Sequence, residues 1–112
     1  MFIYKLCGAE EWQTARDLDR YEGAPIDIAD GYIHFSDAGT VEETAAKHFA
    51  GRKDLVLVAV AAEALGPALR WEPSRGGALF PHLYGALDLG AVLWARPLPL
   101  GEDGRHQFPA LA

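Results

Sequence analysis

The seven residues Leu55–Ala61 constrain the fold of this chain more than any other stretch. They read Leu-Val-Leu-Val-Ala-Val-Ala, with three valines and no polar side chain. β-Branched residues favour strands, and a strand that is apolar on both faces needs a cover on both faces. The run therefore predicts a central β-strand with packed layers on either side.

Weaker patterns around this run predict further short elements. Trp12, Ala15 and Leu18 share a face at helical spacing, and Thr40 with Glu43 has the form of a capping box at the start of a second helix. Residues 20–29, with a glycine and a proline, predict a polar loop. The expected order is a strand at 2–6, a helix at 10–18, a strand at 30–37, a helix at 40–49, the central strand, and then strands at 69–72, 79–85 and 91–96.

Proline and glycine positions refine the prediction for the last third of the chain. Pro81 has no amide proton for a ladder, so we expect residues 79–85 at a sheet edge or in an irregular segment. The tail from Gly101 carries no pattern. Strands and helices in this order predict an α+β fold in a single domain over residues 1–112, with a core over about 1–98 and a C-terminal tail at 101–112.

Length and charge exclude several classes of protein. With 112 residues and a net charge of −6, the chain fits one domain and lacks the basic face needed to bind an extended nucleic-acid backbone, although a local basic pocket remains open. No apolar run approaches the roughly 20 residues of a membrane span, and the N-terminus is too short and mixed for a signal peptide. The one cysteine, Cys7, forms no internal disulfide. We expect a cytoplasmic protein without membrane contact.

The stretch from Asp30 to Asp37 alternates apolar and polar side chains. In an extended chain Ile33 and Phe35 point one way, while Tyr32, His34 and Ser36 point the other, about 6 to 7 Å from one residue to the next but one. One face therefore suits a core. The other presents a phenol, an imidazole and a hydroxyl in a row, which predicts either decoration of a sheet or the wall of a site.

Two later segments add polar side chains of the types used in proton transfer: Glu72 beside Trp71, and His82 with Tyr84. Glu72 and His82 are our candidate catalytic residues, and Tyr32, His34, Ser36, Arg75 and Tyr84 our candidate ligand-binding residues. Each also has a structural interpretation, because histidines on half-buried strands often only complete a hydrogen-bond network. We expect no metal, since no His-x-His, His-x-x-x-His or cysteine pair is present.

Several segments together resemble a bacterial family catalogued as domain of unknown function 952. The likeness reaches to about Leu98. Its most specific parts are Asp30-Gly31-Tyr32-Ile33-His34-Phe35-Ser36 and Phe80-Pro81-His82-Leu83-Tyr84-Gly85. The other parts are Ile3-Tyr4-Lys5 with Trp12, Thr44-Ala45, Asp54-Leu55-Val56-Leu57 and Trp71-Glu72.

This resemblance implies the ADP-ribosyltransferase fold, in which split, mostly antiparallel sheets with short helices bind NAD in a cleft. It implies that His34 and Ser36 hold a ribose and that a carboxylate stabilises an oxocarbenium-like transition state. The family with RNA 2′-phosphotransferase activity is also similar, and it surrounds a phosphate with arginines. Here the sequence departs from both patterns: Glu72 precedes the Phe-Pro-His segment instead of following it, and Arg52, Arg70 and Arg75 form no evident set.

Three hypotheses follow. The chain is an enzyme that uses a nucleotide such as NAD for ADP-ribosyl or RNA phosphate transfer. Alternatively, it is a small-molecule binding module without catalysis, or a structural or partner-binding protein whose polar residues complete a core. Convergence of His34, Ser36, Glu72, His82 and Tyr84 in one cleft would favour the first two over the third.

Overall fold

The computed structural model of the protein describes residues 1–111, except for the side chain of Arg75. Nine strands, three α-helices and three 3₁₀-helices follow one another in this part of the chain. In chain order they are β1 (Phe2–Gly8), α1 (Ala9–Leu18), β2 (Arg20–Tyr21), α2 (Pro25–Asp30), β3 (Ile33–His34), β4 (Ser36–Asp37), α3 (Val41–His48), β5 (Leu55–Ala61), η1 (Ala62–Ala68), β6 (Leu69–Pro73), η2 (Arg75–Gly77), β7 (Leu79–Leu83), β8 (Leu87–Asp88), η3 (Leu89–Ala91) and β9 (Val92–Leu98).

β5 lies inside a four-stranded antiparallel sheet with the order β4-β1-β5-β9, as its apolar sequence predicts. Its alternate side chains enter two separate cores. The first core contains Val58 and Val60 with Ile3, Cys7, Trp12, Ala15, Tyr21, Ile33, Phe35, Leu83 and Leu87. The second core, on the other side of β5, contains Leu55, Leu57 and Ala59 with Tyr4, Leu6, Val41, Ala45 and Leu98.

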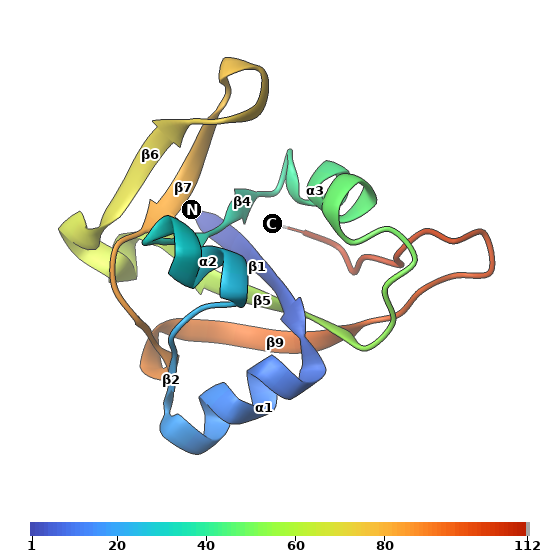
Figure 1. The fold of residues 1–112 in the computed structure, drawn as a ribbon, viewed down its shortest axis with the longest axis horizontal. Helices are drawn as coiled ribbons and strands as arrows, with labels where there is room; N and C mark the ends of the chain where they lie inside the picture. Colours follow the sequence, from blue (N-terminus) through green and yellow to red (C-terminus); the bar gives the residue numbers. More distant parts are fainter. Residues whose placement is uncertain (112) are drawn as a thin grey trace.

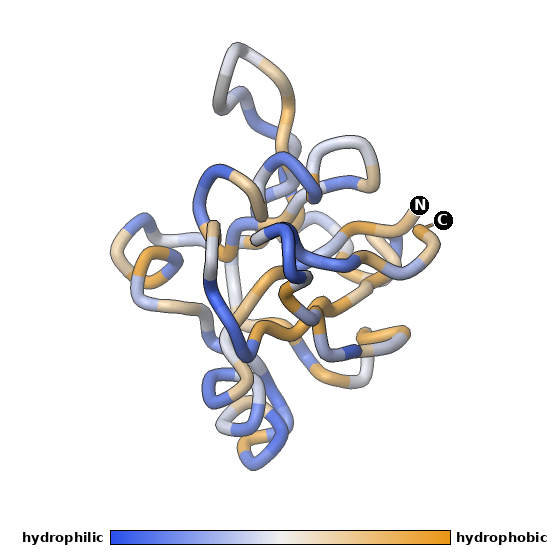
Figure 2. The backbone as a smooth tube through the Cα atoms, turned by 90° about the vertical axis from the view of Figure 1, so that its right-hand side faces the viewer, coloured by the Kyte–Doolittle hydropathy of each residue, from blue (hydrophilic) through white to orange (hydrophobic). Residues whose placement is uncertain are grey.

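Two smaller antiparallel sheets complete an α+β domain: β3-β7-β6, and the pair β2-β8. Figure 1 shows β6 and β7 extending away from the four-stranded sheet, with α1 on the opposite side of the molecule. Figure 2 shows hydrophobic segments crossing the middle of the molecule and hydrophilic ones in the outer loops. No helix among residues 1–111 is long and apolar enough to cross a membrane.

The stretch 30–37 does not form one continuous strand. Asp30 ends α2, and Gly31 stops that helix in the left-handed region with φ of 86°. The chain then pairs with β7 at Ile33 and His34, and with β1 at Ser36 and Asp37. It therefore passes from one sheet to the other at residue 35. The expected alternation is confirmed, since the side chains of both Ile33 and Phe35 are buried.

The expectation for Pro81 is wrong, because β7 is the middle strand of its sheet. The carbonyl of Pro81 accepts a hydrogen bond from the Phe35 amide, at 3.0 Å. Phe35 lies between β3 and β4, where the β3–β7 ladder ends, whereas the β6–β7 ladder continues to Leu79. The nitrogen and carbonyl of a strand residue face the same neighbour, so the missing donor of Pro81 faces the end of the β3 ladder and not β6.

The predicted loop at 20–29 is also wrong, because it contains β2 and α2. Pro25 stands in the first turn of α2, where a missing amide proton costs nothing. Asp27 Oδ2 accepts a hydrogen bond from the Ala24 amide at 2.7 Å and so closes the start of the helix. In α3, by contrast, the predicted capping box is absent: Thr40 makes no side-chain cap, and its hydroxyl donates to Asp37 instead.

The tail, for which the sequence shows no pattern, packs onto the body of the domain. Phe108 and Leu111 contact the second core. His106 Nε2 lies 2.8 Å from the carbonyl of Arg52, and Leu100 forms a β-bridge with His106. Apolar residues of the tail thus cover the second core, although the sequence of the tail shows no periodic pattern.

We predict that Phe108→Ala lowers the free energy of unfolding by about 1–2 kcal/mol, less than for a fully buried phenylalanine because Phe108 is only partly buried. Glu102→Ala, at an exposed position of the same tail, is the control and should change it by less than about 0.5 kcal/mol. Urea denaturation measures both. Equal midpoints for the two variants would mean that the tail does not support the second core.

Candidate functional site

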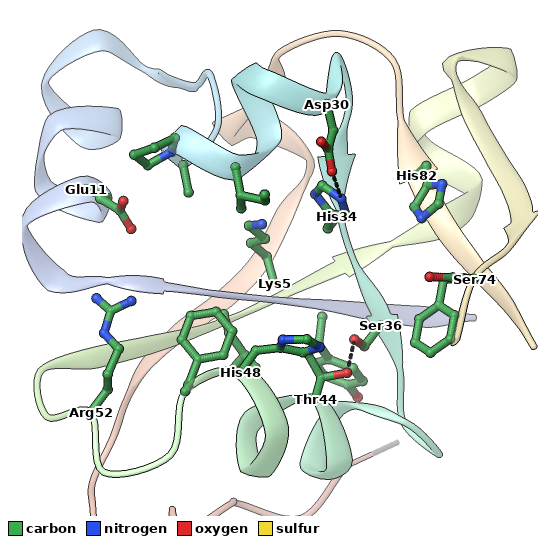
Figure 3. A pocket seen from close by; sticks show the side chains of 17 residues that line it. Lys5, Glu11, Asp30, His34, Ser36, Thr44, His48, Arg52, Ser74 and His82 are labelled. Carbon is green, nitrogen blue, oxygen red and sulfur yellow. Dashed lines mark hydrogen bonds and ion pairs between the residues drawn. The ribbon is translucent and has the colours of Figure 1, made fainter. Parts of the chain in front are cut away.

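A cleft of about 640 Å³ crosses the edge of β1 where β4 leaves it uncovered. β4 pairs with β1 only at Ile3 and Tyr4, so at Lys5 and Leu6, which line the cleft, β1 has a neighbouring strand on the β5 side alone. Residues of α2 form one rim and residues of α3 the other. Figure 3 shows Glu11 and Arg52 at one end, His82 and Ser74 at the other, and His34, Ser36 and Thr44 between them. The volume lies in the range of small-molecule sites.

His34 stands in the middle of the cleft and contacts two carboxylates of α2. Its Nδ1 lies 2.6 Å from Asp27 Oδ1, and its Nε2 lies 3.0 Å from Asp30 Oδ2. Its backbone amide also donates to Asp27 Oδ1, at 3.1 Å. The Nδ1 contact is a hydrogen bond, whereas the Nε2 contact is a charge contact at ion-pair distance. His34 is therefore held between two carboxylates, one on each side of its ring.

Asp27 also forms a buried ion pair with Lys5, whose Nζ lies 2.8 Å from Oδ2 and 3.0 Å from Oδ1. The two side chains are only 6% and 1% exposed. Burial raises the pKa of Asp27, but the hydrogen bond from His34 and the charge of Lys5 outweigh burial and hold this pKa well below its usual range. The positive charge of Lys5 is thus neutralised beneath the cleft.

His82 has a separate carboxylate partner. Its Nδ1 lies 2.8 Å from Glu72 Oε1, and the Tyr84 hydroxyl donates to the same oxygen at 2.7 Å. The hydrogen bonds from Tyr84 and His82 lower the pKa of Glu72, and the bond to Glu72 raises the pKa of Tyr84. With its Nδ1 proton directed to Glu72, His82 has Nε2 as its basic nitrogen. Among the described residues, Nε2 has no hydrogen-bond partner.

Tyr32 joins the two histidine groups. Its ring centroid lies 4.7 Å from that of His34, 4.1 Å from that of His82 and 5.2 Å from that of Tyr84. His34 and His82 are register partners on β3 and β7, and their rings are 5.6 Å apart. Five of the predicted residues therefore converge: Tyr32, His34, Glu72, His82 and Tyr84.

The predicted residues do not all face the cleft. His34, Ser36 and His82 line it, whereas Glu72 and Tyr84 lie behind His82 on its solvent side. Ser36 is buried and its hydroxyl lies 3.0 Å from that of Thr44 on α3. The predicted ligand-binding role of Arg75 concerns a side chain outside the described residues.

Several titratable groups that line the cleft were not among the candidate site residues: Lys5, Glu11, Asp30 and His48, with Arg52 considered only for a phosphate. The buried Asp27 beneath them was not a candidate either. One signal was available. Lys5 lies between apolar residues of a predicted buried strand, and a buried ammonium requires a partner, so a carboxylate had to come from elsewhere in the chain.

The thiol of Cys7 offers no nucleophile. It is buried in the first core, and burial raises its pKa to about 12. A thiol with such a pKa is almost wholly protonated at neutral pH. Among residues 1–111, no group of three or more His, Cys, Asp or Glu side chains is arranged to hold a metal ion.

We predict that Lys5→Met lowers the free energy of unfolding by about 3–5 kcal/mol, because it leaves the buried Asp27 carboxylate short of a cation. Lys47→Met is the matched control. Lys47 pairs with Glu43 at 2.8 Å on the surface of α3, and losing an exposed pair costs less than about 1 kcal/mol. Chemical denaturation compares the two, and similar losses would contradict a special role for the buried pair.

A second prediction concerns pH. Because the pKa of Asp27 is lower in the folded state, its contribution to stability is present above the unfolded pKa of about 3.9 and is lost as pH falls below it. The difference in free energy of unfolding between wild type and Asp27→Asn should therefore shrink from pH 6 to pH 3. Urea titrations at several pH values measure it. A constant difference would show that Asp27 keeps an ordinary pKa.

Comparisons with known proteins agree with the family predicted from the sequence. The family described as "Protein of unknown function (DUF952)" matches residues 6–95. The crystal structure of protein CC0527 from Caulobacter crescentus is 48% identical, with a TM-score of 0.92 over 96% of this chain and 94% of that one. The solution NMR structure of CC0527 is 49% identical, with a TM-score of 0.86 over 95% and 91%. None of the curated proteins compared matches the chain. With a family match over most of its length, the chain belongs to the DUF952 family.

Proposed function

We propose that the cleft binds a nucleotide of the NAD or ADP-ribose type. The observation that carries this proposal is the pair of imidazoles, His34 and His82, which come from neighbouring strands and line one cleft of about 640 Å³ together with Ser36 on β4. A segment that carries a histidine and a serine two residues apart, and that passes from one antiparallel sheet to another, also fits the ADP-ribosyltransferase-like fold. We therefore include the assignment of the ADP-ribosyltransferase-like fold in the proposal.

The two ends of the cleft suit different parts of such a ligand. At one end Phe80 and His82 offer an aromatic surface for stacking and a ring nitrogen for hydrogen bonding. At the other end Arg52 and His48 line the cleft, and the Arg52 guanidinium has no carboxylate within ion-pair distance among the described residues. The phosphates of the ligand would lie at this end, since Lys5 is already paired.

Transfer of an ADP-ribosyl group or of an RNA phosphate is the activity that the family resemblance implies. A carboxylate that stabilises an oxocarbenium-like ion has to lie close to that ion. The carboxylate of Glu72 is instead directed to His82 and Tyr84. In an enzyme, Glu72 would therefore act as a positioning residue, and His82 Nε2 would exchange the proton.

A binding module without catalysis is the second candidate, and the cleft's own carboxylates favour it. Asp30 lies within ion-pair distance of His34, and Glu11 Oε1 accepts a hydrogen bond from the Gly8 amide at 2.8 Å. Each of these carboxylates therefore already has one partner within the protein. A prolonged incubation with NAD separates the candidates: released nicotinamide that disappears in Glu72→Gln indicates an enzyme, and binding without release indicates a module.

We predict that millimolar ADP-ribose or NAD shifts the imidazole resonances of His34 and His82 in NMR spectra. His106 lies outside the cleft, bonded to the Arg52 carbonyl, and is the internal control. Its resonances should move much less than those of the other two. If no histidine in the cleft responds to either ligand at millimolar concentration, the proposed function is wrong.

A further inference from the structure

His34 is not free to hold a ribose in the way that the family resemblance implies. One ring nitrogen is hydrogen-bonded to the buried Asp27, and the other lies within ion-pair distance of Asp30. The Ser36 hydroxyl contacts that of Thr44. Both residues expected to contact the ribose thus already have partners within the protein, and His34 would have to give up a carboxylate contact to bond a sugar.

Asp30 is the polar group that these contacts leave available in the middle of the cleft. It is the last residue of α2, its side chain is 41% exposed, and it lines the cleft beside His34, as Figure 3 shows. Its Oδ2 lies 3.0 Å from His34 Nε2, whereas its Oδ1 has no hydrogen-bond partner among residues 1–111. His34 therefore fixes the carboxylate and leaves acceptor positions directed to a ligand.

We propose that Asp30, held in place by His34, accepts the hydroxyl groups of the ligand's ribose and selects a free 2′,3′-diol over a 2′-phosphate. This inference rests on the proposed function of the cleft. A carboxylate is an acceptor only, and a vicinal diol offers it two donors. Acidic residues that contact a ribose diol serve the same purpose in dinucleotide-binding folds of another class.

The charges around Asp30 exclude a phosphate at this position. Lys5 is bonded to both oxygens of Asp27, so its charge is already balanced. His34 lies between Asp27 and Asp30, so it adds no unpaired positive charge. A 2′-phosphate would therefore add negative charge beside a carboxylate without an unpaired cation, and like charges at short range repel strongly in a partly desolvated cleft. Arg52 lies at the far end of the cleft, where it suits the diphosphate.

Calorimetric titration with two ligands, ADP-ribose and its 2′-phosphorylated form, tests the proposal. We expect the wild type to bind ADP-ribose at least tenfold more tightly. Asp30→Asn should lose most of this preference, because an amide of the same size has no charge to repel the phosphate, while the bond from His34 Nδ1 to Asp27 keeps that ring in place. Asp17→Asn is the control: it removes a charge on α1 outside the cleft, where Asp17 accepts from Gln13, and should keep the full preference.

The outcomes separate this inference from the function on which it rests. If the wild type binds both ligands equally, or if Asp30→Asn keeps the tenfold preference, Asp30 does not select the diol, although the cleft still binds nucleotides. If the wild type binds neither ligand, the proposed function and this inference both fail. Asp30→Ser, a smaller neutral replacement, repeats the comparison should Asp30→Asn fold poorly, and its melting temperature shows that it is folded.

Discussion

The buried carboxylate of Asp27 is the contact on which the cleft depends. It accepts hydrogen bonds from Lys5 on β1, from the His34 ring and backbone on β3, and from the Ala24 amide at the start of α2. One anion thereby joins two sheets and the helix that forms a rim of the cleft. A glycine at position 23 leaves room for the Asp27 side chain. Gly23 has a φ of 116°, and a Cβ there would lie 2.9 Å from the Cβ of Asp27. Because burying these charges is costly, each partner is needed to balance the others.

Hydrophobic patterns predict an element correctly when the residues of that element alone are enough to identify it. β5 is apolar on both faces, and the structure places a core on each. The helix at 10–18 was also correct, although Leu18 is exposed and does not share the buried face. The predictions that were wrong depend on contacts between segments that are far apart in the sequence. Nothing near Pro81 indicates that its strand partner ends at residue 34, and α2 is only six residues long, too short for a periodic pattern.

The site shows the same division. The alternation around His34 and the residue types near His82 located both histidines, and the structure brings them together with Tyr32, Glu72 and Tyr84. The sequence did not predict which carboxylate contacts which imidazole. Asp27 and Asp30 lay in a segment predicted as loop or strand, so they were not considered. A helix that carries acids three residues apart places both on one side, and here both meet the same imidazole ring.

This pairing gives the two histidines different chemistry. His34 contacts a carboxylate at each nitrogen, so it can hold neighbouring groups in place but offers no unpaired nitrogen to a ligand. His82 donates at one nitrogen and keeps the other unbonded among the described residues, and the exposed Tyr84 adds a second donor to the carboxylate behind it. Proton transfer in this cleft, if the protein catalyses it, therefore has to occur at the His82 end. The His34 end, where carboxylate oxygens are the acceptors, is suited to binding hydroxyl groups.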